Sequence, residues 1–256
     1  MKPNRLRELL AKGQTPLGHM VQEFGTRGIA KLTENAGVDF VLIDMEHSGL
    51  DLGAVADLVA WFKATHVAPI VRVPATEYHL IARVMDTGAL GIMAPNVRTP
   101  EQAQKVIDAM RYKPEGNRGL GLGSAHNDYI PPTPHEYMYE ANRNNLFLCQ
   151  IESTTALDNL DAIAALPGVD VLWVGHSDLS QSMGIVGEFE HPDFIAALKK
   201  VAEAAKRHGK AAGIQPGSVK QAREWMALGY NVISYAVDHA IYRAGLKVAI
   251  EELRSE

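Results

Sequence analysis

Short apolar segments alternate with longer helical patterns along the whole chain. Eight segments are typical of strands, near residues 17–21, 40–45, 69–73, 91–95, 147–152, 170–175, 211–215 and 231–236. Several of them are apolar almost throughout, which is typical of parallel strands that helices cover on both faces. We therefore expect an α/β protein with a single (β/α)8 TIM-type barrel over residues 1–256, with a doubly wound open sheet as the alternative.

Helical periodicity separates these strands. Helices are predicted at 51–64, 100–111, 194–208, 219–228 and 241–253. Thr99 followed by Pro100, for example, is a typical helix start. Residues 112–145 break the alternation, because they are rich in Gly, Pro and Asn. Such a long irregular connection in a compact domain is usually a binding loop or a disordered excursion.

Composition limits the class of protein. The chain is 46% hydrophobic and 21% charged, with a formal net charge of −5, so we expect no nucleic-acid partner and no membrane partner. The single cysteine, Cys149, allows neither an intrachain disulfide nor a thiolate metal cluster. Residues 1–13 lack a signal-peptide pattern and no run of about 18 apolar residues occurs, so a cytoplasmic protein is expected.

Polar and ionisable residues collect directly after the predicted strands. In barrels of this type the working residues lie at the C-terminal strand ends. Here those ends carry Arg72 and the segments 44–47, 150–152 and 175–178. A purely structural strand end would more often carry Gly, Pro or Asn. We therefore expect a functional site at this rim.

Glu152 and Asp178 are the strongest candidates for metal binding. They follow consecutive strands, so their carboxylates would lie close together. Two like charges that near each other cannot both stay ionised without a cation. Mg²⁺ or Mn²⁺, with waters and a substrate in the other positions, would resolve this. The alternative for each carboxylate is a solvated loop residue or a helix cap, which Asp178 could be.

Arg72 and His47 are the candidate partners of that metal. Arg72 lies inside an apolar strand, where an unpaired guanidinium is very costly. Either a structural ion pair or a substrate carboxylate or enolate oxygen would satisfy it. His47 is the kind of residue that is usually structural or exposed, but beside a metal and an arginine it becomes a candidate general base.

Several segments occur together in one order: VLIDMEHSGLD (41–51), VRV (71–73), RVMDTGALGIMAPNV (83–97), PEGNRGLG (114–121), QIES (150–153) and GVDVLWVGHSDLSQSMG (168–184). In this order they resemble the HpcH/HpaI family, the metal-dependent class II pyruvate aldolases similar to 4-hydroxy-2-oxoheptanedioate aldolase. The resemblance implies a barrel of the phosphoenolpyruvate/pyruvate type. It also implies a carbon–carbon lyase that depends on Mg²⁺ or Mn²⁺, with Co²⁺ and Zn²⁺ as the other candidates.

The resemblance also assigns roles to residues. It implies that Glu152 and Asp178 bind the metal and that Arg72 binds pyruvate. His47 corresponds to the family's base, and Asp86 to the acidic partner of that base. Asp86 would orient His47 and increase its basicity.

Further substrate contacts follow from the same resemblance. Gln150 corresponds to a glutamine beside the metal, and Asp44 to an acid near the mouth of the barrel. The turn Gly175-His176-Ser177 corresponds to backbone amides that hold the pyruvate carboxylate. His176 departs from the family pattern, which often has Pro there. The segment 124–132 also diverges, and we expect it at the aldehyde site, so the acceptor aldehyde stays open.

The implied partners are a small 2-oxo acid, an aldehyde and further copies of the chain. The family resemblance implies a homohexamer, a trimer of dimers, in which helix 241–253 is exchanged between subunits. The expected reaction is reversible cleavage of a 4-hydroxy-2-oxo acid to pyruvate, or a related 2-oxo acid, and an aldehyde through a metal-stabilised enolate. The alternatives are a citrate-synthase-like enzyme, an acyl-CoA lyase, or a non-catalytic barrel that binds 2-oxo acids.

Overall fold

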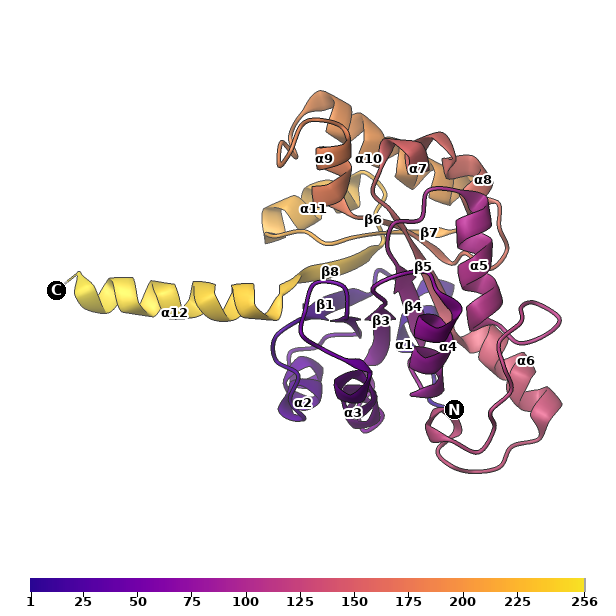
Figure 1. Cartoon of the computed structure of the whole chain (residues 1–256). Helices are drawn as coiled ribbons and strands as arrows, with labels where there is room; N and C mark the ends of the chain where they lie inside the picture. Colours follow the sequence, from indigo (N-terminus) through magenta and orange to yellow (C-terminus); the bar gives the residue numbers. More distant parts are fainter. Residues whose placement is uncertain (256) are drawn as a thin grey trace.

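The computed structural model describes residues 1–255 and is a closed parallel barrel surrounded by helices (Figure 1). Its strands are β1 (Leu17–Val21), β2 (Phe40–Asp44), β3 (Ala68–Arg72), β4 (Gly91–Ala94), β5 (Leu146–Ile151), β6 (Val171–Val174), β7 (Ala211–Ile214) and β8 (Val232–Val237). Strand order follows chain order, and β8 pairs with β1 to close the sheet. The expected (β/α)8 barrel is confirmed, and the open doubly wound sheet is excluded.

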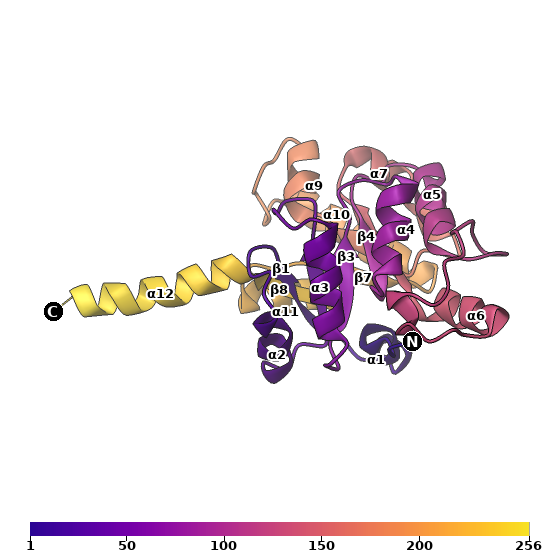
Figure 2. The same cartoon turned by 60° about the horizontal axis from the view of Figure 1, so that its bottom comes forward.

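Helices follow each strand, and most of them lie around the outside of the barrel, whereas the last one extends away from it (Figure 2). They are α1 (Arg5–Ala11), α2 (Gly28–Asn35), α3 (Leu52–Phe62), α4 (Tyr78–Asp86), α5 (Pro100–Met110), α6 (Pro134–Asn144), α7 (Thr154–Asp158), α8 (Leu160–Ala164), α9 (His176–Ser182), α10 (Pro192–Arg207), α11 (Val219–Ala227) and α12 (Asp238–Arg254), with a 3-10 turn, η1, at Ala125–Asn127. The helices predicted from periodicity correspond to α3, α5, α10, α11 and α12. Thr99 caps α5 as expected, in a capping box with Gln102.

Strand side chains alternate between two cores. Phe40 and Leu42 of β2 point into the barrel, whereas Val41 and Ile43 pack in the layer between the barrel and the helices. All four are fully buried. This two-sided burial explains why the strands appear as nearly continuous apolar runs. Gly18 of β1 is required because the ring of Phe40 occupies the space that a Cβ atom would need.

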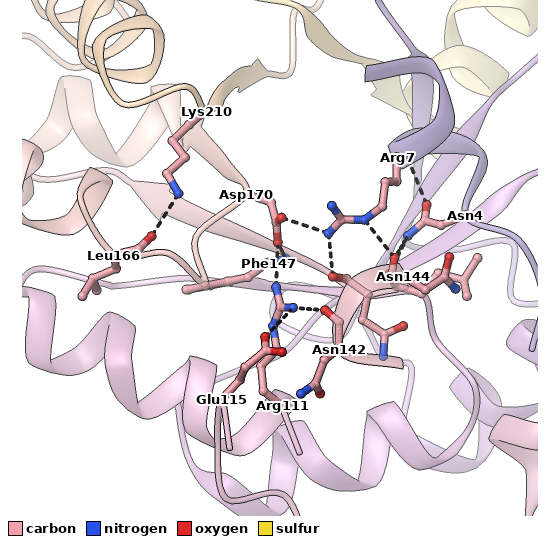
Figure 3. Close-up of polar contacts among 12 residues, drawn as sticks. Asn4, Arg7, Arg111, Glu115, Asn142, Asn144, Phe147, Leu166, Asp170 and Lys210 are labelled. Carbon is pink, nitrogen blue, oxygen red and sulfur yellow. Dashed lines mark hydrogen bonds and ion pairs between the residues drawn. The ribbon is translucent and has the colours of Figure 1, made fainter. Parts of the chain in front are cut away.

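The N-terminal end of the barrel is closed by α1. Leu6 is fully buried in the cluster that fills the barrel. The Asn4 side chain caps α1 and donates to the Leu90 carbonyl at 2.9 Å. Arg7 and Arg111 donate to the two oxygens of Asp170 at 2.9 and 3.3 Å, which ties α1 to the start of β6 (Figure 3). A cavity lined by strand ends lies at the opposite, C-terminal end.

The connection 112–145 differs from its prediction in structure and place. Residues 134–144 form α6, so the irregular part is shorter than expected. Lys63, just beyond the end of α3, donates to the Ala125 carbonyl and to Asp128. Helices run against the strands, so this contact lies at the N-terminal end of the barrel. Within one chain, the expected position of 124–132 at the aldehyde site is wrong.

Helix α12 extends away from the barrel in both views (Figures 1 and 2). Its first residue, Asp238, is buried, but the rest of the helix is largely exposed. The exposed large apolar side chains on it are Ile241, Tyr242, Leu246, Val248, Ile250 and Leu253. No helix within residues 1–255 is long and apolar enough to cross a membrane.

Candidate active site

A cavity of about 360 Å³ opens at the C-terminal end of the barrel. Ends of strands from both halves of the chain line it, as expected for a barrel of this type. Of the residues singled out from sequence, those lining it are His47, Arg72, Gln150, Gly175, His176, Ser177 and Asp178. Asp44 and Glu152 lie beneath this lining, in contact with Arg72 and Gln150 respectively. Asp86, at the end of α4, does not line this cavity.

Arg72 and Asp44 form a buried bidentate pair at the ends of β3 and β2. Arg72 Nε and Nη2 donate to Asp44 Oδ1 and Oδ2, both at 2.7 Å. Burial alone would raise the pKa of Asp44, but the hydrogen bonds and charge of Arg72 hold it below its ordinary value. Burial alone would lower the pKa of Arg72, but the hydrogen bonds and the charge of Asp44 raise it above its ordinary value. The pair therefore stays ionised.

Asp44 has no free oxygen for a substrate. It is fully buried, and its carboxylate also accepts from Gln22 Nε2 at 2.6 Å and from the Glu46 amide at 3.0 Å. The resemblance suggested a substrate contact at the barrel mouth. In the structure Asp44 instead lies below the pocket, where it holds Arg72.

Glu46 was missed by the sequence reasoning, although it lies between Asp44 and His47. Its Oε2 is 3.2 Å from Arg72 Nη1 and 3.7 Å from His47 Nε2, and this buried oxygen has no hydrogen-bond donor. Burial raises the pKa of Glu46; Arg72 opposes the shift, whereas Asp44 and Asp178 add to it. The sequence held one indication of a role for Glu46, which is an acidic residue in the segment directly after β2.

Glu152 brings a further buried carboxylate to the rim. One oxygen accepts from the Asn96 amide and the other from Gln150 Nε2. Burial raises the pKa of Glu152, and the charges of Glu46 and Asp178 add to the shift. Its carboxylate occupies the space that a Cβ atom on Gly175 would need, so only glycine fits that turn. Glu152 thus packs against the turn that leads into Asp178.

These acids fit a divalent cation. Within residues 1–255 no group of three or more His, Cys, Asp or Glu side chains forms a complete metal site. Glu152 and Asp178 nevertheless supply two carboxylates, and the buried Glu46 Oε2 and Gln150 Oε1 both lack hydrogen-bond donors. Carboxylate and amide oxygens grouped in this way suit Mg²⁺ or Mn²⁺, which keep water ligands beside few carboxylates.

The Gly175-His176-Ser177 turn lines the cavity, and the His176 ring packs in an aromatic cluster. The ring lies 5.0 Å from the Phe189 ring and 5.6 Å from the Trp225 ring, between centroids. Burial lowers the pKa of His176 to about 4, so the imidazole is neutral at pH 7. An aromatic packing role thus accounts for a histidine where the family often has Pro.

His47 and Asp86 lie at opposite ends of the barrel. His47 follows β2 at the pocket, and 58% of its side chain is exposed. Asp86 is the last residue of α4, just before β4, and its carboxylate accepts from Arg118 Nη2 at 2.5 Å. The expected contact between Asp86 and His47 is therefore wrong within a single chain.

Comparison with known proteins identifies the family to which the chain belongs. The model of the HpcH/HpaI aldolase/citrate lyase family matches residues 26–244. The chain belongs to this family. It is 36% identical over 244 residues to the hydroxypyruvate/pyruvate aldolase of Roseobacter denitrificans, covering 93% of this chain and 92% of the relative. It is 33% identical over 243 residues to the 5-keto-4-deoxy-D-glucarate aldolase of Salmonella arizonae, covering 95% and 94%.

Solved structures agree with this family assignment. The HpcH/HpaI aldolase from Desulfitobacterium hafniense DCB-2 superimposes with a TM-score of 0.94 at 28% sequence identity, covering 98% of this chain and 97% of that one. The chain is thus an enzyme of the aldolase type, a carbon–carbon lyase. This favours aldol chemistry over the citrate-synthase-like alternative and over a non-catalytic barrel.

Proposed function

We propose that the chain cleaves a 4-hydroxy-2-oxo acid to pyruvate, or a related 2-oxo acid, and an aldehyde, with a divalent metal as cofactor, and that it also catalyses the reverse addition. The observation that carries the proposal is the cluster of acids at this rim, Glu46, Glu152 and Asp178, beside the guanidinium of Arg72, which lies 3.2 Å from Glu46. This combination binds a cation and an oxyanion side by side.

Glu152 and Asp178 would hold Mg²⁺ or Mn²⁺. The orphaned oxygens Glu46 Oε2 and Gln150 Oε1 would accept hydrogen bonds from groups around it. When bound, the ion acts as a Lewis acid that stabilises the enolate of the 2-oxo acid. A bound cation would also oppose the burial and the charges of Glu46 and Asp178 that raise the pKa of Glu152.

Arg72 would add a second positive contact to the enolate oxygen. Its guanidinium cannot rotate freely, because Asp44 fixes two of its nitrogens and leaves Nη1 toward Glu46 and the cavity. A donor that is already oriented needs no reorganisation as negative charge develops. The amides of the Gly175-His176-Ser177 turn would hold the substrate carboxylate.

His47 would take the proton of the C4 hydroxyl as the C3–C4 bond breaks. It lines the cavity and is exposed enough to pass that proton to water. Asp86 can orient His47 only if it comes from a second copy of the chain, because its own lies at the other end of the barrel. The Arg118 guanidinium holds its partly exposed carboxylate ready for such a contact.

A second copy of the chain would also cover α12. That helix exposes a row of large apolar side chains while its first turn is anchored to the barrel. Contiguous exposed apolar surface of this kind marks a protein–protein interface. We propose that α12 packs on a neighbouring subunit in a homohexamer, a trimer of dimers.

The test is cleavage of a 4-hydroxy-2-oxo acid coupled to detection of pyruvate. Metal-stripped enzyme should be inactive and should recover with Mg²⁺ or Mn²⁺. Arg72→Ala should lower kcat/KM by about 100- to 1,000-fold, the cost of losing one oxyanion donor. Arg207→Ala, which removes an exposed arginine paired with Asp161, is the matched control. Activity that survives exhaustive removal of metal would contradict the proposal.

A further inference from the structure

The first residue of α12 anchors the loop that follows β1. Asp238 is 3% exposed, and its Oδ2 accepts three consecutive backbone amides, those of Gln22, Glu23 and Phe24, at 3.0, 2.9 and 2.8 Å. The Phe24 ring packs edge-on against Tyr242, one turn further along α12, at 5.7 Å between centroids. The shape of the loop thus depends on a residue 214 positions further along the chain.

This loop carries Gln22 to the buried pair beneath the pocket. Gln22 Nε2 donates to Asp44 Oδ2 at 2.6 Å, and Arg72 Nη2 donates to the same oxygen at 2.7 Å. His239 Nε2 lies 3.2 Å from Gln22 Oε1, so α12 also contacts the other end of this amide. Asp238 is therefore connected to the guanidinium through the Gln22 backbone, the Gln22 side chain and Asp44.

Asp238 supplies the common acceptor for the backbone amides of the loop 22–24. No regular strand pairing holds residues 22–24, since the β1 register with β2 ends at Val21. Without the carboxylate, three amides lose their common acceptor and the loop relaxes toward solvent. The Gln22 amide would then leave Asp44, whose carboxylate would keep the Glu46 amide and Arg72 as its donors, and the position of the pair would shift.

We propose that Asp238 is a positioning residue for the reaction. Through the loop 22–24 and the Gln22 amide it sets the orientation of Asp44, and so the direction in which Arg72 faces the substrate. Asp238 itself touches no reacting atom. The proposal rests on the proposed function, because it assumes that Arg72 contacts the substrate. A purely structural role, anchoring α12 alone, is the competing explanation.

A double-mutant cycle with the metal-loaded enzyme separates the two roles. Asp238→Asn and Gln22→Ala should each lower kcat/KM by about ten-fold or more, the usual effect of removing an outer-layer hydrogen-bond partner. In the Gln22→Ala background, Asp238→Asn should change kcat/KM by less than about two-fold, since independent sites would multiply their effects. Thermal unfolding is measured for every variant.

Asn4→Ala is the matched control. It also removes a buried side chain with several hydrogen bonds to backbone groups, but at the closed end of the barrel. It should lower Tm and leave kcat/KM unchanged. Multiplicative losses in the double variant, or wild-type kcat/KM in Gln22→Ala, would overturn the positioning role. If Asp238→Asn does not fold, the kcat/KM of Gln22→Ala still tests the positioning role. Retained cleavage in Arg72→Ala would instead overturn the proposed function.

Discussion

Removing Asp44 tests whether the buried pair is what keeps Arg72 in place. Arg72 is 7% exposed in the intact protein, and Asp44→Ala would leave its guanidinium with Glu46, at 3.2 Å, as the remaining anion. Breaking a buried ion pair from one side costs about 3–5 kcal/mol. Because Glu46 remains, we expect about 3 kcal/mol, the lower end of that range, and a fall in Tm of about 6–12 °C for a chain of this size.

A second substitution tests the same reasoning, because it should change the stability in the opposite direction. Replacing a whole buried ion pair with apolar groups is often nearly neutral. Asp44→Ala combined with Arg72→Met should therefore be more stable than Asp44→Ala alone. The assay is urea unfolding of both variants at one protein concentration and pH 7. If the double variant is no more stable than the single one, or the single loss is below about 1 kcal/mol, as for a surface pair, the reasoning is refuted.

Three further predictions follow from the same geometry. In the folded, metal-free protein the pKa of Glu152 lies above its ordinary value, so stability is lost as the pH rises from the ordinary pKa to the raised one. Glu152→Gln should therefore raise the Tm of the metal-free protein at pH 8, and it should abolish the recovery of activity by Mg²⁺. Burial lowers the pKa of His176 to about 4, so stability present above pH 6.5 is lost as pH falls toward 4; His176→Phe should flatten that loss in urea unfolding at pH 7 and 4.5. Deleting residues 241–256 should reduce the assembly size measured by sedimentation, and an unchanged size would contradict packing of α12 on a neighbour.

Much of the fold was predictable because two-sided burial leaves a strong pattern. Each strand of a covered parallel sheet must be apolar on both faces, so all eight strands stood out. Short helices such as α7 and α8 carry too few turns for periodicity to reveal them. Helix α6 begins at Pro134 within a segment whose Gly and Pro content suggested a loop. Its place at the closed end depends on contacts with distant residues such as Asn4.

The candidate site was predictable in part. Arg72 ends an apolar strand, and Glu152 and Asp178 follow apolar strands. Their charges therefore stand out from the surrounding sequence. Glu46 follows the same strand as His47, but nothing in the local pattern shows that its carboxylate lacks a donor. Gln22 and Asp238 lie 216 positions apart, and their contact exists only because β8 closes on β1.

The sequence by itself determined which residues reach the open rim, because every side chain that follows a strand of a closed parallel barrel must lie at the same end. Only the tertiary structure decided how those residues pair. It places Asp44 under Arg72, turns the His176 ring into an aromatic cluster and separates Asp86 from His47. Pairing depends on side-chain direction and on distances across the barrel, and a linear pattern of residue types specifies neither.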